Sequence, residues 1–246
     1  MSQSITQVRF AKPAEGIPTA DNWAFTHDAL PELQDGEIAV KMHYLSVDPA
    51  MKGWISTKRS YIAPVELGAV MRGFGVGEVT QSRSDYYQVG DFCTGFTGIC
   101  THGVYNSREL RKVDVGHAPV SNLMGGLGMP GFTAYFGLLD IGKPEAGETV
   151  VVSSAAGAVG HVVCQIAKLK DCRVVAIAGG PNKCRYLKEE LGVDAVMPQG
   201  DILNGSGVAQ FVQPSAQLAG NSNISIKWPV AVSGTVNMVA RVDLPS

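Results

Sequence analysis

Short apolar segments separated by Gly, Pro and Asp fill the first 120 residues. Clear examples are residues 37–42, 75–79 and 91–96, and Val89-Gly90-Asp91 is a turn signal between two of them. Runs this short, at this spacing, predict the strands of a compact β-barrel or sandwich. Residues 1–120 are therefore expected to form one domain.

From residue 121 the pattern predicts strands and helices in alternation. Residues 149–153 are apolar on both faces, as in a strand buried in a parallel sheet, and residues 173–178 repeat this character. Helices are expected over residues 133–139, 158–169 and 181–191, and a third strand starts over residues 193–196. This order predicts an α/β fold with right-handed crossovers over residues 121–196.

The helix over residues 158–169 has an apolar face with helical spacing. The residues predicted to be buried on it are Val159, Val162, Val163, Ile166 and Leu169.

Residues 197–246 break this rhythm and are left unassigned as an atypical tail. Their charged residues are Asp201, Lys227, Arg241 and Asp243, and no amphipathic helix supplies the crossover that another parallel strand needs. The sheet would therefore keep an unpaired edge unless the tail covers it. The β-prone segment 224–232 is the candidate for that role.

Composition narrows the classes of function. Twenty Lys and Arg face 22 Asp and Glu in 246 residues, so no general attraction to nucleic acid or anionic lipid is expected. The N-terminus lacks the apolar core of a signal peptide, and no apolar run is long enough to span a bilayer. Five scattered cysteines without a C-x-x-C pair indicate a reducing, cytoplasmic location.

The strongest local motif lies between the first apolar strand of the α/β region and the helix after it. Residues 155–160 read Ala-Ala-Gly-Ala-Val-Gly, a G-x-G-x-x-G pattern with Ala in first place. Gly157 would let the backbone approach a pyrophosphate, and Gly160 would let the helix pack closely on the strand. A small-residue turn that binds nothing is the alternative.

The next strand ends in Gly179-Gly180 and not in the Asp or Glu that usually binds the ribose of NAD. Lys183 follows shortly and would attract a 2′-phosphate, so the sequence favours NADPH as the cofactor. Arg185 could assist. The alternative is that both side chains are ordinary solvated residues.

No metal is assigned. The five histidines, His27, His43, His102, His117 and His161, show no paired spacing, and no group of four close cysteines could hold a structural zinc.

Several longer segments resemble one known family. They are residues 45–53 (LSVDPAMKG), 60–64 (SYIAP), 71–77 (MRGFGVG), 127–142 (LGMPGFTAYFGLLDIG) and 178–184 (AGGPNKC). These segments are similar to the zinc-independent alkenal/one oxidoreductases of the medium-chain dehydrogenase/reductase type. That group includes prostaglandin reductases, plant double-bond reductases and bacterial curcumin reductases. The resemblance covers roughly residues 5–196.

This resemblance implies a GroES-like β-barrel catalytic domain followed by a partial NADP-binding Rossmann domain. It also implies an enzyme that transfers hydride from NADPH to the C=C bond of α,β-unsaturated aldehydes or ketones. The expected partner is a small-molecule enone or enal, and a homodimer is left open. The alternatives are an NADPH-dependent quinone reductase and a truncated, non-catalytic nucleotide-binding fragment.

The resemblance also implies residue roles. Gly157, Ala158, Val159, Gly160 and His161 match the pyrophosphate loop, with Gly179 and Gly180 after the next strand. Lys183 matches a lysine that binds the 2′-phosphate, and Thr133 lies in the segment expected near the nicotinamide. Tyr61 matches a tyrosine of the substrate pocket, where a phenol could donate to an enolate oxygen. Relatives carry further strands, helices and a return segment to the barrel, none of which is recognisable in residues 197–246.

Overall fold

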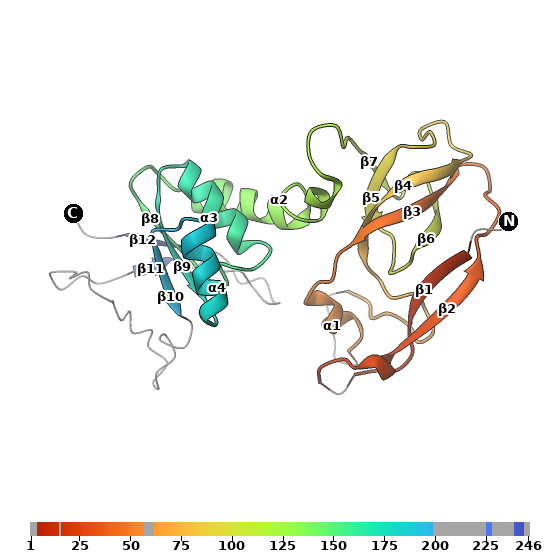
Figure 1. Cartoon of the computed structure of the whole chain (residues 1–246), viewed down its shortest axis with the longest axis horizontal. Coiled ribbons are helices and arrows are strands. Elements are labelled where there is room, and N and C mark those ends of the chain that lie inside the picture. Colours follow the sequence, from red (N-terminus) through yellow and green to blue (C-terminus); the bar gives the residue numbers. More distant parts are fainter. Residues whose placement is uncertain (1–3, 15, 57–61, 199–224, 228–238, 244–246) are drawn as a thin grey trace. The chain divides into compact units, whose positions relative to one another are not determined.

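The computed structural model divides into two compact units, Met1–Met124 and Gly125–Ser246, shown in Figure 1. It describes residues 4–14, 16–56, 62–198, 225–227 and 239–243. None of the helices in these ranges has both the length and the apolar character needed to cross a membrane.

The first unit is built mainly of antiparallel strands. Its strands are β1 (Ser4–Phe10), β2 (Trp23–Ala29), β3 (Glu37–Leu45), β4 (Phe74–Ser82), β5 (Phe92–Phe96), β6 (His102–Asn106) and β7 (Arg111–Val113). Strands β1 and β2 form a hairpin, and the other five form one sheet in the order β6-β3-β4-β5-β7. Short helices are Ala20–Asn22, α1 (Ala50–Trp54) and Val120–Met124.

Two apolar clusters stabilise this unit. Ile38, Val40 and Val79 project from β3 and β4 and are buried with Tyr87, Cys93 and Leu110. A second cluster contains Phe10, Trp54, Ile55, Val65 and Met71. The predicted strand segments at 37–42, 75–79 and 91–96 lie in β3, β4 and β5, which agrees with the expected β-rich architecture.

The second unit alternates helices and strands as the sequence predicts. Its elements are α2 (Met129–Tyr135) with a π-helical continuation (Phe136–Gly142), β8 (Thr149–Val152), α3 (Gly160–Leu169), β9 (Arg173–Ala178), α4 (Pro181–Arg185) with a π-helical continuation (Tyr186–Glu190), β10 (Ala195–Pro198), β11 (Ser225–Lys227) and β12 (Val239–Asp243). The sheet order is β10-β9-β8-β12-β11, and β10, β9 and β8 run parallel. The predicted α/β class is therefore confirmed.

The tail departs from the expectation for the sheet edge. Residues 239–242 of β12 pair antiparallel with β8, and residues 225–227 pair with β12 instead of with β8. The covering strand thus lies outside the predicted segment 224–232. A strand that runs antiparallel to its neighbour needs no helical crossover, which is why the missing helix pattern did not exclude it.

One predicted helix face is partly wrong. Val163 is fully buried in α3, but Leu169 is 83% exposed. The other side chains of α3 that are buried in the core are Cys164 and Ala167, because the helix turns its small residues toward β8 and β9.

Candidate functional site

The turn between β8 and α3 is tight and held by backbone hydrogen bonds. Ser154 has a φ of 48°, a left-handed conformation that costs a residue with a Cβ atom some strain. The N–H of Gly157 donates to the carbonyl of Ser154 at 2.8 Å. The N–H of Ala155 donates to Ile177 of β9 at 3.0 Å, which fixes the turn to the neighbouring strand.

Gly160 permits the closest contact between α3 and the strand that precedes it. A Cβ atom at this position would lie 2.5 Å from the carbonyl oxygen of Ser154 and 2.8 Å from the Cα of Ala155. Real Cβ atoms essentially never come that close to backbone atoms. The sequence-based expectation that this glycine allows close helix–strand packing agrees with this geometry.

The start of α3 offers backbone donors. Within the described residues, the N–H groups of Ala158, Val159 and Gly160 donate no hydrogen bond, whereas the N–H of His161 donates to Gly157 at 3.1 Å. Unpaired N–H groups at the positive end of a helix form a favourable environment for an anion.

The end of β9 provides a second feature that favours a negatively charged ligand. Gly179 and Gly180 follow the strand, and the φ of 80° at Gly180 is a conformation that suits glycine. Pro181 then begins α4, which places Lys183 in its first turn with an exposed side chain. No ion pair of Lys183 is found in the part of the chain that the structure describes.

Strand order brings these two features together. Because β8 and β9 are parallel neighbours, with Val152 opposite Ala176, their carboxyl ends meet at one edge of the sheet (Figure 1). The turn before α3 and the turn before α4 both leave from this edge. In open α/β sheets this is where ligands bind.

The segment from Ser153 to Arg185 carries few acids. Its only carboxylate is Asp171, which precedes β9 and so lies at the other end of that strand. Arg185 donates to Asn182 at 2.6 Å, so its guanidinium already has a partner within α4. The two turns thus provide N–H groups and a cation that have no partner among the described residues, an arrangement suited to a ligand with several phosphates.

Known proteins resemble this chain over most of its residues. A family model described as the N-terminal domain of oxidoreductase matches residues 6–113. YfmJ of Bacillus subtilis (strain 168) is 45% identical over 194 residues, 79% of this chain and 57% of YfmJ. The NADPH-dependent curcumin reductase of Escherichia coli (strain K12) is 43% identical over 187 residues, 76% of this chain and 54% of that enzyme.

A solved structure of a similar protein also aligns with this chain. CurA from Vibrio vulnificus in complex with NADPH aligns with a TM-score of 0.73 at 42% identity, over 78% of this chain and 57% of CurA. The predicted resemblance to the zinc-independent alkenal/one oxidoreductases is confirmed. The chain spans a little over half the length of these reductases.

The structure does not bring all the predicted site residues of a zinc-independent reductase together. Tyr61 lies outside the described residues. Thr133 lies on the exposed side of α2, where its hydroxyl donates to the carbonyl of Met129 at 2.8 Å. The roles of both residues stay predictions.

The described residues contain no metal-binding cluster, and two of the cysteine thiols are buried in the core. No group of three or more His, Cys, Asp or Glu side chains there could hold a metal ion. All five cysteines are free. Burial, with a smaller effect from Asp91, raises the pKa of the Cys93 thiol to about 12, and burial also raises that of Cys164 to about 12. Both thiols therefore stay protonated and belong to the core.

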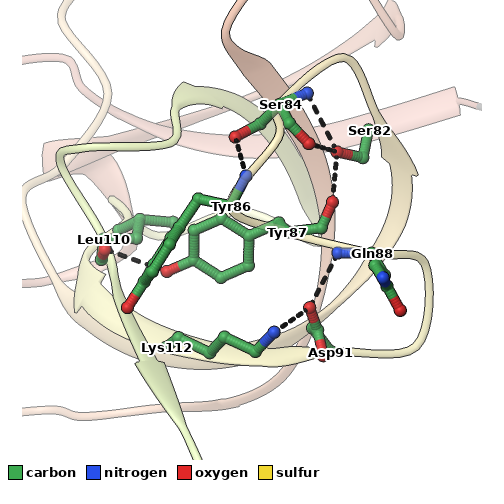
Figure 2. Close-up of polar contacts among 8 residues, drawn as sticks. All are labelled: Ser82, Ser84, Tyr86, Tyr87, Gln88, Asp91, Leu110 and Lys112. Carbon is green, nitrogen blue, oxygen red and sulfur yellow. Dashed lines mark hydrogen bonds and ion pairs between the residues drawn. The ribbon is translucent and has the colours of Figure 1, made fainter.

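Two polar arrangements in the structure were not predicted from sequence. In the first, shown in Figure 2, the buried Tyr87 donates its hydroxyl to the carbonyl of Leu110 at 2.9 Å. Lys112 lies over the rings of Tyr86 and Tyr87 and pairs with Asp91. The only signal for this cluster was the consecutive pair of tyrosines beside a turn.

The second arrangement lies near the start of β9, away from the two turns described above. Asp194 accepts the N–H of Val174 at 2.6 Å and the ammonium of Lys168 at 2.9 and 3.0 Å. It therefore joins α3, β9 and the segment before β10. Burial raises the pKa of this carboxyl, but the bonds from Val174 and Lys168 together outweigh it, and the pKa lies below its usual value.

Proposed function

We propose that this chain binds NADPH and reduces the C=C bond of α,β-unsaturated aldehydes or ketones. The observation that carries the proposal is the pairing of two turns at one sheet edge. The turn before α3 presents unpaired N–H groups, and the turn before α4 presents Lys183 with no carboxylate partner among the described residues.

The cofactor part rests on charge and geometry. The N–H groups of Ala158, Val159 and Gly160 would bind the pyrophosphate, and Lys183 would bind the 2′-phosphate that distinguishes NADPH from NADH. Gly179 and Gly180 leave space and no negative charge at the place where NAD-preferring sites carry a carboxylate. The similarity to CurA, solved with NADPH, supports this assignment.

The substrate part rests on the relatives and on the chemistry of two side chains. When bound, NADPH supplies the hydride that adds to the β-carbon of the substrate. The electron pair of the C=C bond then moves toward the carbonyl oxygen, and a proton from solvent completes the α-carbon. We assign Tyr61 as the donor to that oxygen, because a phenol is neutral and can donate near pH 7. Thr133 would lie near the nicotinamide.

Two measurements on the purified chain test the proposal. Calorimetric titration with NADPH should show binding at one site. The near-ultraviolet absorbance of NADPH should then fall when a simple unsaturated ketone is added, and Tyr61→Phe should slow this loss with little change in NADPH affinity. Absence of NADPH binding by well-folded protein would exclude the proposal.

Nucleotide binding without catalysis is the second candidate. It is favoured by residues 197–246, whose sequence does not resemble that of the reductases and which place the antiparallel strand β12 beside β8. Binding of NADPH with no turnover of either an enone or a quinone would support this candidate. Turnover of a quinone alone would indicate a quinone reductase.

A further inference from the structure

His161 is oriented by its own helix turn. The carbonyl of Gly157 accepts two hydrogen bonds from it, one from the backbone N–H at 3.1 Å and one from ring atom Nδ1 at 2.9 Å. A carbonyl oxygen can only accept, so Nδ1 must carry a hydrogen. In the neutral ring Nε2 is then a lone-pair acceptor, and only the imidazolium form has an N–H at Nε2.

The location of this ring matters because it lies at the anion-attracting end of α3. His161 directly follows Gly160, and the three preceding N–H groups are the donors proposed for the pyrophosphate. Phosphate oxygens are acceptors and carry negative charge. At Nε2 a neutral His161 can offer such a ligand only a lone pair, whereas the imidazolium can donate a charge-assisted hydrogen bond.

The described elements that pack against α3 carry no carboxylate that could compete for His161. Helix α3 packs against α2, β8 and β9. Apart from His161, the titratable residues of these four elements are Tyr135, Cys164, Lys168 and Arg173. None is a carboxylate, Cys164 is buried, and the ammonium of Lys168 is paired with Asp194. The loop 153–159 carries no charged residue.

We propose that His161 binds the diphosphate of the dinucleotide as an imidazolium, so that cofactor binding takes up a proton from solvent. This inference rests on the proposed NADPH site and adds a proton to its binding equilibrium. One proton enters at Nε2 for each nucleotide bound to a neutral His161. Affinity therefore rises as pH falls, by up to about tenfold per pH unit where the free protein holds His161 neutral.

Calorimetry measures this proton directly. The full chain is titrated at one mildly alkaline pH in two buffers of different ionisation enthalpy, and the difference in observed heat gives the protons taken up. NADH serves as a second ligand, because it has the diphosphate but lacks the titratable 2′-phosphate. Uptake of a proton is expected with both nucleotides.

Two variants test whether the proton is taken up by His161 or by another group of the chain. With NADH as the ligand, His161→Gln should abolish the proton uptake, weaken binding several-fold and remove the pH dependence. His117→Gln, which changes an exposed histidine in the first unit, should leave all three unchanged. Binding of both nucleotides without proton uptake, or the same uptake in His161→Gln, would overturn the inference but not the proposed NADPH site.

Imidazole nitrogen resonances give a second readout that needs no variant. At the mildly alkaline pH of the titration, NADPH should add a hydrogen at Nε2 to a ring that already carries one at Nδ1. A ring that stays neutral in the complex would overturn the inference. Failure of NADPH to bind at any pH would overturn the proposed function together with it.

Discussion

At the scale of single residues, Gly160 offers the sharpest test of the turn. Replacing it by Ala puts a Cβ atom 2.5 Å from the carbonyl oxygen of Ser154, so α3 must shift away from the strand. We expect Gly160→Ala to lower the free energy of unfolding by about 1–3 kcal/mol, the usual cost of overpacking, and to weaken NADPH binding. Urea unfolding and nucleotide titration measure the two effects.

Gly137→Ala is the matched control. A Cβ atom at Gly137 would have no heavy atom within 4 Å, and this residue also lies in a helical segment. It should therefore keep both stability and binding. Equal losses in the two variants would show that the contact at Gly160 has no special role.

Lys183 tests the choice of nucleotide. Lys183→Ala removes the cation proposed for the 2′-phosphate, so NADPH should bind about 10- to 100-fold more weakly, the range for loss of a hydrogen bond to a charged group. NADH lacks that phosphate and should bind almost as before. Lys188→Ala, a change of another exposed lysine after α4, should affect neither. A similar loss for both nucleotides would remove the assignment.

Tyr87 tests the arrangement in Figure 2. Its hydroxyl donates to Leu110 inside the core of the first unit, so Tyr87→Phe leaves a buried carbonyl without its donor. We expect a loss of about 1–2 kcal/mol in the free energy of unfolding, measured by urea. Tyr86→Phe, beside it on an exposed ring, should cost far less. Equal costs would contradict the role of this hydrogen bond.

At this scale the sequence predicts backbone requirements better than side-chain partners. The role of Gly160 follows from the motif because a strand–turn–helix always brings the helix start close to the strand. Burial of Leu169 was predicted wrongly, because helical spacing gives the face of a helix but not where the neighbouring strands end. Asp194 was missed because its partners are 20 and 26 residues away.

At the scale of elements, Asp194 joins α3, β9 and the start of β10. Asp194→Ala removes the bonds to Val174 and Lys168, and it should lower the free energy of unfolding at pH 7. We expect about 1 kcal/mol, a value reduced because the carboxyl is partly exposed and screened by solvent. Glu190→Ala, at an exposed carboxyl, serves as the control.

The effect of Asp194 should depend on pH in one direction. The folded-state pKa of this carboxyl is lowered, so its contribution is complete above the pKa of the unfolded chain, about 3.9. It is lost as pH falls through the lower pKa of the folded state. The free energies of unfolding in urea of the unmodified chain and of Asp194→Ala should therefore differ at pH 7 and become equal in strong acid. A difference that persists in acid would assign the effect to packing instead.

Element boundaries show where sequence patterns stop being informative. Helix α2 begins at Met129, four residues before the predicted start, because Pro130 at the first turn is compatible with the start of a helix. The strands over residues 149–152 and 173–178 were predicted almost to the residue. Their short, continuous apolar runs are typical of strands buried in a parallel sheet.

At the scale of the whole molecule, β12 covers the edge that β8 would otherwise leave unpaired. Its residues 239–243 run antiparallel to β8, with Val239 opposite Val152 and Val242 opposite Thr149. The sequence could not specify this pairing, because strands distant along the chain can pair in several registers. This strand lies beside the strand that leads into the proposed pyrophosphate turn.

Hydrogen exchange tests that pairing within a single sample. If β12 closes the edge of the sheet, the amides of residues 239–243 should be protected to the same degree as those of β8, because a paired edge opens only when the sheet does. The amides of β10, at the opposite edge, provide an internal reference for a strand with a neighbour on one side only. Rapid exchange over residues 239–243 while residues 149–152 stay protected would show that β8 itself is the edge. The sheet of the second unit would then consist of the three parallel strands alone, with a row of unpaired backbone groups beside the proposed pyrophosphate turn.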